Sequence, residues 1–319
     1  MKRAWLAGLV IVCAGRSALA EEANVGAVGT VGATPAPAAA PAQVVSGGER
    51  FAAPNGQLGA GIWADPEQKA RAFGELGFMR TGYSFFNNDV HITSLSFLVG
   101  GGYKITPNLE LQAMLPFAWA NFAGGDQSES GFAFGNLHLG VSYLHFGGPL
   151  RVMVGGALEY GPWTGGYEAD STLAVLLGHP AMGGEGLGLW FPEVFSIVAP
   201  ARIEYAFPTI PALVLSGDVA LGLHIPTGGG DTELTIQLSP GLGYYATDTV
   251  LVGMRLPFTV VPTESGGDAT FFALQPYGRF EFGRAFLDAS LVLNVDDPYG
   301  FAFDEGKYWA LRLGGGGSF

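Results

Sequence analysis

The last eleven residues of the chain, WALRLGGGGSF at positions 309–319, alternate between two kinds of side chain. Large apolar side chains stand at odd positions: Trp309, Leu311, Leu313 and Phe319. The polar residues Arg312 and Ser318 stand at even positions. Because successive side chains of a β-strand point to opposite faces, this period of two predicts a strand with one apolar and one polar face. The strand ends on an aromatic residue at the carboxy terminus.

The same alternation recurs along most of the chain. From Gly74 onward we distinguish about twelve segments of the kind found in membrane-spanning β-strands. The clearest are residues 95–105, 109–115, 137–143, 150–154, 203–205, 215–219, 234–239, 256–258, 280–282 and 287–291. Strands can cross lipid only in a closed barrel, because hydrocarbon offers no hydrogen-bond partner to an open edge. The pattern predicts an all-β fold, a transmembrane antiparallel up-and-down β-barrel of about 12 strands over residues 72–319.

The connections between these segments alternate between short and long. The short ones are residues 106–108, 147–149, 208–211, 247–249 and 283–285, and the long, more acidic ones are 123–131, 161–189, 227–232, 262–269 and 296–306. Barrels of bacterial outer membranes have short periplasmic turns and longer extracellular loops. The alternation therefore predicts a bacterial outer-membrane location, with both termini in the periplasm. A soluble β-sandwich is the alternative, but sandwich strands are usually shorter and lack this asymmetry.

The amino-terminal end has the features of a secretory signal peptide at residues 1–20. A short basic stretch ends at Arg3, an apolar run covers residues 4–14, and an Ala-x-Ala pattern precedes cleavage after Ala20. The only cysteine, Cys13, lies inside this segment. Lipidation at Cys13 is a poorer alternative, because Val12 stands where a small residue belongs. After cleavage the chain has no cysteine, which excludes disulfides and thiol chemistry.

Residues 21–71 separate the signal peptide from the expected barrel. They begin rich in alanine, proline and glycine, with almost no charge up to residue 50, which predicts an extended or disordered periplasmic linker. Residues 51–71 either continue this linker or enter the barrel mouth as a small plug.

Composition also favours a barrel over a soluble enzyme. Only 13% of residues are charged, 48% are hydrophobic, and 51 are glycine. No apolar run is long enough for a transmembrane helix. The net charge is -13, and removal of Lys2, Arg3 and Arg16 with the signal peptide leaves 12 basic against 28 acidic residues, a net charge of -16. Such an acidic surface argues against nucleic acid as a partner.

If the apolar face of each strand meets lipid, a nearly balanced set of charged side chains and histidines faces the lumen. The expected set is Arg80, Lys104, Glu110, His138, Arg151, Glu159, Arg202, Glu204, Asp218, His224, Arg255, Arg279, Glu281, Asp288 and Arg312. A charge on the lipid face at mid-membrane would cost about 2–4 kcal/mol. These charges either pair across neighbouring strands and fill the lumen, or line a narrow pore and select solutes. Twelve strands lie between the filled barrels of about 8 and the open channels of about 16–18 strands.

The long segment 161–189 contains an amphipathic stretch, residues 171–179, that predicts a short helix. The plain interpretation is a surface loop hairpin. The alternative is a segment that folds inward as a constriction or guards a hydrophobic opening.

No catalytic or metal-binding pattern is present, so an enzyme is not expected. The five histidines show no metal-ligand spacing, and no cofactor is indicated. His138 and Glu159 are expected to be neighbours across the short turn at 147–149. Ser142 is about 13 Å along the strand from His138, which is too far for a hydrogen-bonded nucleophile. Acidic pairs at 296–297 and 304–305 are expected to form a solvated loop, with a calcium site as the alternative.

Residues 131–143, GFAFGNLHLGVSY, resemble a Gly-Asp-x-x-x-Gly-x-Tyr motif of the phenol-degradation meta-pathway barrel family. The sequence departs from that motif at Asn136, where the family has aspartate. The chain as a whole resembles a Gram-negative outer-membrane β-barrel. The family resemblance implies transport of small hydrophobic compounds.

We therefore expect a porin-like channel or transporter through which small, apolar molecules diffuse passively. A non-conducting structural or surface-binding barrel is the alternative, and an outer-membrane lipid hydrolase is less favoured. Expected partners are outer-membrane lipid and lipopolysaccharide, an unidentified small solute, and the barrel-assembly machinery, which should recognise Phe319.

Overall fold

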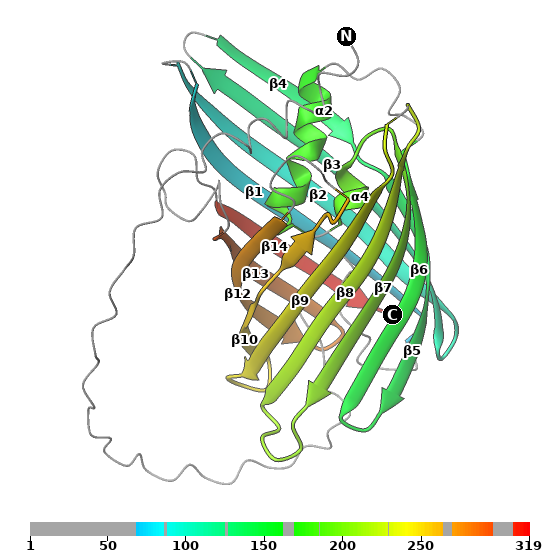
Figure 1. Cartoon of the computed structure of the whole chain (residues 1–319). Coiled ribbons are helices and arrows are strands. Elements are labelled where there is room, and N and C mark those ends of the chain that lie inside the picture. Colours follow the sequence, from blue (N-terminus) through cyan, green and yellow to red (C-terminus); the bar gives the residue numbers. More distant parts are fainter. Residues whose placement is uncertain are drawn as a thin grey trace, which may run out of the picture.

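The computed structural model describes residues 68–85, 88–124, 127–161, 169–184, 186–228, 230–263, 270–295 and 309–319. Within these ranges the chain forms one antiparallel sheet of 14 strands and a set of short helices (Figure 1). The first strands are β1 (Ala70–Phe85), β2 (Asn88–Thr106), β3 (Leu109–Gly124), β4 (Gln127–Phe134), β5 (Leu137–Gly147), β6 (Leu150–Tyr160) and β7 (Val194–Ala206). The others are β8 (Leu213–Pro226), β9 (Glu233–Tyr245), β10 (Val250–Arg255), β11 (Phe258–Val260), β12 (Thr270–Phe282), β13 (Ala285–Asn294) and β14 (Trp309–Ser318). Between β6 and β7 lie α2 (Ala169–Leu176), α3 (Gly178–Ala181) and α4 (Leu187–Trp190).

The sheet closes into a barrel because its first and last strands pair. The seam between β1 and β14 runs from the pair Arg71 and Ser318 to the pair Arg80 and Trp309. The terminal Phe319 completes it: its N–H donates to the carbonyl of Ala70 at 2.8 Å, and its carbonyl accepts from the N–H of Ala70 at 3.0 Å. We call the end of the barrel where β1 begins and β14 ends the terminal end, and the opposite end the loop end.

Two of the twelve wall strands are interrupted. β4 and β5 both pair with β3, and β10 and β11 both pair with β9 and β12, so the wall is a 12-stranded up-and-down barrel with two extra strand pieces. The prediction of about 12 strands is confirmed. The expected strand at 256–258 is not continuous, because Leu256 and Pro257 separate β10 from β11. Pro257 has no N–H to donate to a neighbouring strand.

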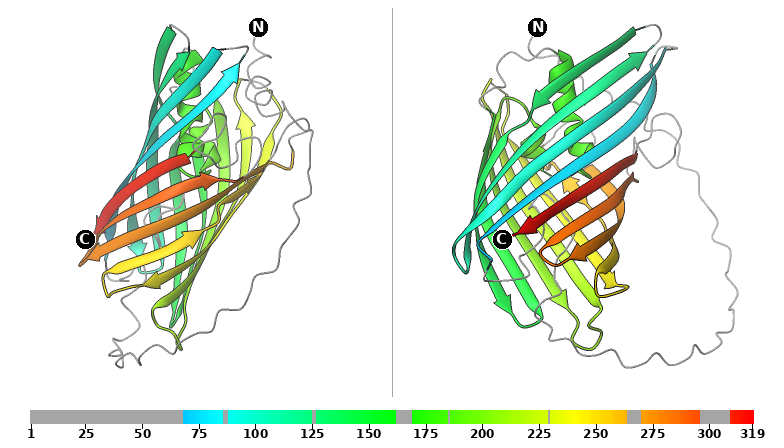
Figure 2. Two further views of the ribbon diagram at one scale, coloured as in Figure 1. Left: turned by 90° about the vertical axis from the view of Figure 1, so that its left-hand side faces the viewer. Right: turned by 180° about the vertical axis from the view of Figure 1, so that it is seen from behind.

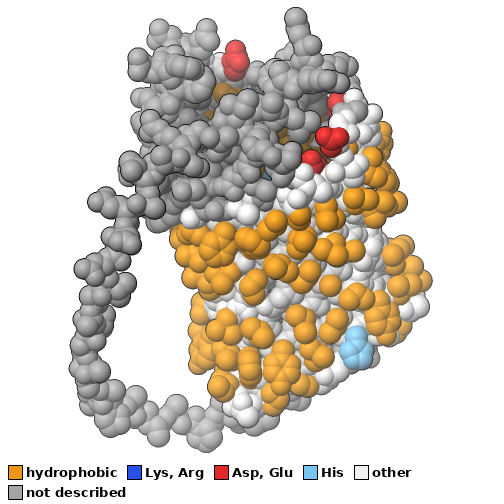
Figure 3. All heavy atoms as spheres, in the orientation of Figure 1, with side chains coloured by type: hydrophobic (Ala, Val, Ile, Leu, Met, Phe, Trp, Pro, Cys, Tyr) orange, Lys and Arg blue, Asp and Glu red, His pale blue; other side chains and the backbone are white. Residues whose placement is uncertain are grey.

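The two faces of the wall differ in chemistry. Large apolar side chains are exposed on the outer face, among them Leu139, Leu158, Ile197, Leu221 and Leu313. On the face seen in Figure 3, apolar side chains cover the wall and acidic side chains gather at its upper end. The alternate residues of each strand face inward and include most of the buried polar side chains. This arrangement is the one that a barrel in lipid requires.

The segment between β6 and β7 does not form a surface hairpin. The helices α2, α3 and α4 lie inside the loop end of the barrel, where α2 packs on β3 and β4 and α3 packs on β1, β2 and β14 (Figures 1 and 2). The interpretation as a surface loop was therefore wrong, whereas the expected helix within residues 171–179 is present as α2. Among the described residues, no helix has the length and apolar character needed to cross a membrane. We call the described residues of this segment, 169–184 and 186–190, the plug.

The expected short turns all join neighbouring strands at the terminal end, as predicted from the sequence. β1 begins at Ala70, slightly before the expected barrel boundary at residue 72. The expected signal peptide and most of the expected linker lie outside the described residues.

Candidate functional site

The inner face of the barrel carries nearly all the charged residues that the strand pattern assigned to it. Buried members of the set are Lys104, Glu110, His138, Arg151, Glu159, Arg202, Glu204, His224, Arg255, Arg279 and Arg312. Asp218, Glu281 and Asp288 are half-buried on the same side of their strands. These side chains come from strands all around the barrel, so the polar lining is not confined to one part of the wall.

Arg80 is the exception, because it is exposed on the outer face, and the expectation that it faces the lumen is wrong. Its neighbours Met79 and Thr81 are buried, so the odd-numbered residues of β1 face inward. Large apolar side chains occupy both faces of β1, which made its orientation ambiguous in the sequence. Arg80 pairs with Trp309, where β14 begins, and a long arginine side chain can extend from such a position toward the membrane surface.

Four charged side chains form a continuous chain across three strands. The Arg202 Nε of β7 donates to Glu204 Oε1 at 3.0 Å, and Arg202 Nη1 lies 3.2 Å from Asp218 Oδ1 of β8. Asp218 Oδ2 in turn accepts from Arg255 Nη2 of β10 at 2.7 Å. Removing one member would leave a buried charge without its counterpart, which costs far more than a surface ion pair is worth.

Two further ion pairs involve residues that the sequence reasoning missed. Arg71 donates to Glu110 Oε1 at 2.6 Å, and Arg312 donates to Glu75 Oε2 at 2.7 Å. Arg71 was missed because the barrel was expected to begin at residue 72. Glu75 was missed because β1 was assigned the wrong inward face. Both residues stand at odd positions of β1. If one odd-numbered residue of that strand had been assigned to the inner face, the period of two would have placed Arg71 and Glu75 there as well.

The histidines on the inner face are held by hydrogen bonds. As expected, His138 lies across from Glu159, with Nδ1 at 2.9 Å from Oε1. His224 Nδ1 lies 2.8 Å from Ser196 Oγ, and its Nε2 lies 2.8 Å from Thr235 Oγ1. Both ring nitrogens of His224 thus form hydrogen bonds with hydroxyl groups. No carboxylate of the described residues bonds to this imidazole and orients it, as the aspartate does in a Ser-His-Asp site. The group lies buried beneath α4 and fits a structural role better than a catalytic one.

The plug reaches across the lumen and contacts opposite walls. On one side, the carbonyl oxygen of Ala181 lies so close to Gly77 of β1 that a Cβ there would be 2.7 Å from it. On the other side, the carbonyl oxygen of Gly184 accepts from Thr259 Oγ1 of β11 at 2.9 Å and from Gln237 Nε2 of β9 at 3.4 Å. The positive φ of Gly184, 74°, is a conformation that suits glycine. The plug therefore contacts β1 on one side and β9 and β11 on the other.

Asn136 anchors the plug to the interruption between β4 and β5. Its Nδ2 donates to the carbonyl oxygens of Gly188 and Phe191, each at 2.7 Å, and lies 3.2 Å from that of Val194. Its backbone N–H donates to the carbonyl of Leu189 at 2.7 Å. Asn136 is fully buried, and its one side chain offers a donor to carbonyl groups of α4 and of the residues that lead into β7. The sequence named Asn136 only as a departure from a motif.

An apolar cluster connects the plug with the wall below it. Its plug members are Val175, Met182, Leu189 and Trp190, and its wall members are Phe73, Leu98, Met114, Ala118, Ala133 and Phe286. Trp190 is 1% exposed and lies flat against Gly178 of α3. Phe286 also carries the guanidinium of Arg279 at 3.8 Å from its ring centre, within the range of a cation–π contact. The apolar cluster thus lies among charged side chains of the same strands, since Arg71 and Glu75 stand two residues on either side of Phe73 on β1.

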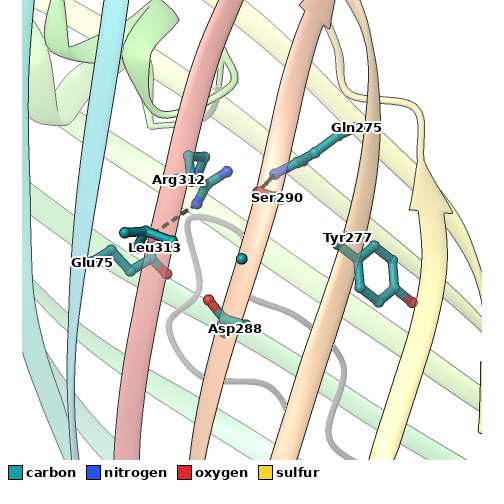
Figure 4. Close-up of a pocket in the computed structure, with 8 residues that line it drawn as sticks. Glu75, Gln275, Tyr277, Asp288, Ser290, Arg312 and Leu313 are labelled. Carbon is teal, nitrogen blue, oxygen red and sulfur yellow. Dashed lines mark hydrogen bonds and ion pairs between the residues drawn. The ribbon is translucent and has the colours of Figure 1, made fainter.

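A small cavity lies in the lumen beside β12, β13 and β14 (Figure 4). Its lining includes the Arg312–Glu75 pair, Tyr277, Asp288 and Gln275. Gln275 Nε2 donates to Ser290 Oγ at 2.8 Å, which fixes the amide at the cavity edge. The cavity has room for roughly one water molecule and is polar enough to hold it. It is too small for an organic solute.

Metal binding finds no support in the part of the chain that the structure describes, where no group of three or more His, Cys, Asp or Glu side chains could hold an ion. The acidic pairs considered for calcium, 296–297 and 304–305, lie outside the described residues.

The fold resembles those of known outer-membrane proteins. An outer membrane channel from Pseudomonas putida F1 aligns with a TM-score of 0.52 at 14% identity, covering 79% of this chain and 96% of the channel. The β domain of a Bordetella autotransporter gives 0.45 at 14% identity, covering 79% of this chain and 100% of that domain. The porin NanC gives 0.44 at 7% identity, covering 78% of this chain and 100% of the porin.

Comparison by sequence gives nothing further, since no protein-family profile and no curated protein matches the chain. The likeness of residues 131–143 to the phenol-degradation barrel family therefore rests on that segment alone. The structural similarity and the closed 12-stranded wall agree, and the chain has the fold of a bacterial outer-membrane β-barrel.

Proposed function

We propose that the protein is a gated outer-membrane channel through which small, uncharged, apolar molecules diffuse passively. The observation that carries this proposal is the apolar cluster, which joins the inward face of the plug to the wall below it. An apolar solute that moves along this cluster replaces the apolar contacts between plug and wall with its own apolar contacts to the same side chains. A hydrated ion would have to lose its water or separate buried ion pairs, both of which are costly.

The size of the barrel supports a gated channel. Barrels of about 8 strands are filled by wall side chains, whereas about 16–18 strands leave an aqueous channel. In this protein a dedicated segment, the plug, occupies the space that twelve strands enclose. A barrel needed only as a wall could dispense with such a segment. A segment held mainly by hydrogen bonds and apolar contacts can move without breaking the wall.

The second candidate is a non-conducting structural or surface-binding barrel. It is favoured by the buried ion pairs and by the cavity that holds only about one water. The lipid hydrolase is disfavoured, because Ser196 and His224 are buried beneath α4 and away from lipid. We retain the proposal that the protein is not an enzyme.

Uptake of an uncharged aromatic probe tests the channel. Cells that produce the protein should accumulate N-phenyl-1-naphthylamine faster than cells with an empty vector. Lipopolysaccharide slows the entry of apolar molecules through the outer membrane, and the apolar cluster would provide a path through the barrel instead. Uptake of the anionic cephalosporin nitrocefin should be the same in both strains. Equal uptake of the aromatic probe, at equal levels of folded barrel, would favour the non-conducting candidate.

The orientation in the membrane follows from loop length. We propose that the terminal end, with its short turns, faces the periplasm and the plug faces outward. An epitope inserted at Asp126, between β3 and β4, should then be labelled by antibody on intact cells. The same epitope at Asn108, in the turn between β2 and β3, should be labelled only after the outer membrane is permeabilised. Labelling at Asn108 on intact cells would reverse the assignment.

The proposed partners follow from the same placement. Outer-membrane lipid and lipopolysaccharide would meet the apolar outer face. The barrel-assembly machinery would recognise Phe319, whose side chain is 68% exposed while its backbone closes the seam.

A further inference from the structure

A cross-strand row of large side chains and glycines leads from the terminal end of the barrel to the plug. Residues directly opposite one another on β13, β14, β1, β2 and β3 are Phe286, Gly316, Phe73, Gly100 and Met114. Because barrel strands are tilted, a row that follows the strand pairing climbs along the barrel axis. It starts beside the turn that precedes β13. The next member of the row is His138 on β5. The hydrogen-bond partner of His138, Glu159, lies directly against Gly188 of α4.

The large side chains of this row pack directly over its glycines. A Cβ at Gly100 would lie 2.5 Å from Phe73 Cζ and 2.8 Å from Met114 Cγ. A Cβ at Gly316 would lie 2.9 Å from both Phe73 Cβ and Phe286 Cε1. Any larger residue at either position would push these side chains away from the wall, since real Cβ atoms do not approach so closely.

Phe73 therefore has a glycine opposite it on both neighbouring strands. Its ring now leans toward Gly100 on β2, and the other side, toward Gly316 on β14, also lacks a Cβ. On the side of β2 the ring meets no Cβ at Gly100, and on the side of β14 the edge of the Phe286 ring lies over Gly316, so a change of the Phe73 χ1 rotamer toward β14 displaces Phe286. Phe73 is 7% exposed and is the member of the apolar cluster that stands three residues from the start of β1, near the terminal end.

The geometry points to this row as the route of the solute below the plug, with Phe73 as the side chain that opens and closes it. The inference rests on the proposed channel function and adds to it the path and the residue that selects what passes. An aromatic side chain at an apolar constriction excludes water and ions by dewetting and admits uncharged apolar molecules. Met114, a flexible and polarizable side chain, suits contact with solutes of different shape.

The charged network of β7, β8 and β10 is a poorer route. A solute passing there would have to separate pairs such as Arg202–Glu204 and Arg255–Asp218, and each buried charge would lose its counterpart. The pair Arg71–Glu110 borders the row over Gly102 and stays intact when the ring of Phe73 moves. Moving the ring of Phe73 breaks only apolar contacts, which the solute itself restores.

Substitutions at Phe73 in the full-length protein test this route. Phe73→Ala should raise the rate of N-phenyl-1-naphthylamine uptake several-fold over wild type, because the constriction is widened. Phe73→Trp should lower it below wild type. Nitrocefin uptake should stay unchanged in both, and the heat-modifiable band should show equal folded barrel. Phe73→Leu serves as a milder replacement if the alanine variant does not fold.

The matched control is Leu251→Ala on β10. Leu251 is also buried on the inner face and near a neighbouring glycine, Gly243, but it packs with Val214, Tyr245 and Tyr277 away from the row. Its variant should behave as wild type. Equal effects at Phe73 and Leu251, or no effect at Phe73, would overturn the route while leaving the channel intact. Equal uptake by cells with the wild-type protein and cells with the empty vector would instead contradict the proposed channel function.

Discussion

Replacing Asn136 by leucine should open the barrel. Leucine has a similar size but donates no hydrogen bond, so the carbonyl groups of Gly188, Phe191 and Val194 lose their shared donor. Gly188 lies in the plug, and Phe191 and Val194 lie where the chain passes from α4 into β7. Each carbonyl left unpaired in a buried site costs about 1–3 kcal/mol, so the attachment of the plug and of this connection to the wall is weakened. In planar bilayers, purified Asn136→Leu should show frequent open events of larger ionic conductance than wild type.

The control for this variant is Gln112→Leu on β3. Gln112 is also a buried inward amide, but it bonds to Glu110 at 3.0 Å and contacts the sulfur of Met153 rather than the plug. Its bilayer traces should match those of wild type. If Asn136→Leu folds normally and its conductance equals that of wild type, the plug is not held by this anchor.

The wall could be predicted from the sequence because lipid imposes a strict rule on it. Each strand must show one apolar face, so segments such as Leu137–Gly147 and Leu150–Tyr160 display their period directly. The neighbouring pair His138 and Glu159 followed from the turn between these strands. The rule failed on β1, where Phe73 and Phe78 place aromatic rings on opposite faces, and Arg80 was misassigned for that reason.

The plug could not be predicted because nothing in its sequence says which surface its apolar side will meet. An amphipathic segment such as Ala169–Leu176 can lie on the outside of a loop or inside a lumen with the same pattern. Its position is decided by contacts far away in the chain. Gly77, where the wall has no side chain, lies on β1, the donor Thr259 lies on β11, and the amide of Asn136 lies between β4 and β5. Only the assembled barrel brings these three together.

Neutralising Glu204 should destabilise the barrel strongly. Glu204 is fully buried, bonds Arg202 at 3.0 Å, and lies directly opposite Arg151 on β6. Glu204→Gln keeps the size of the side chain and removes its charge, leaving two buried arginines without this counterpart. Breaking a buried pair in this way costs about 3–5 kcal/mol. Urea unfolding of the protein in lipid vesicles, followed by tryptophan fluorescence, should show that loss.

The same variant separates a structural network from a pore lining. If the charges hold the wall together, Glu204→Gln should lower stability and leave the cation-to-anion permeability ratio of the Asn136→Leu channel unchanged, since Asp218 still compensates Arg202 at 3.2 Å. If the charges line the pathway of ions, the ratio should shift toward anions. Glu129→Gln on β4, where the side chain is exposed, is the control and should change neither. A spin label at position 204 that is accessible to lipid-soluble oxygen would contradict the inward orientation of β7 on which both outcomes depend.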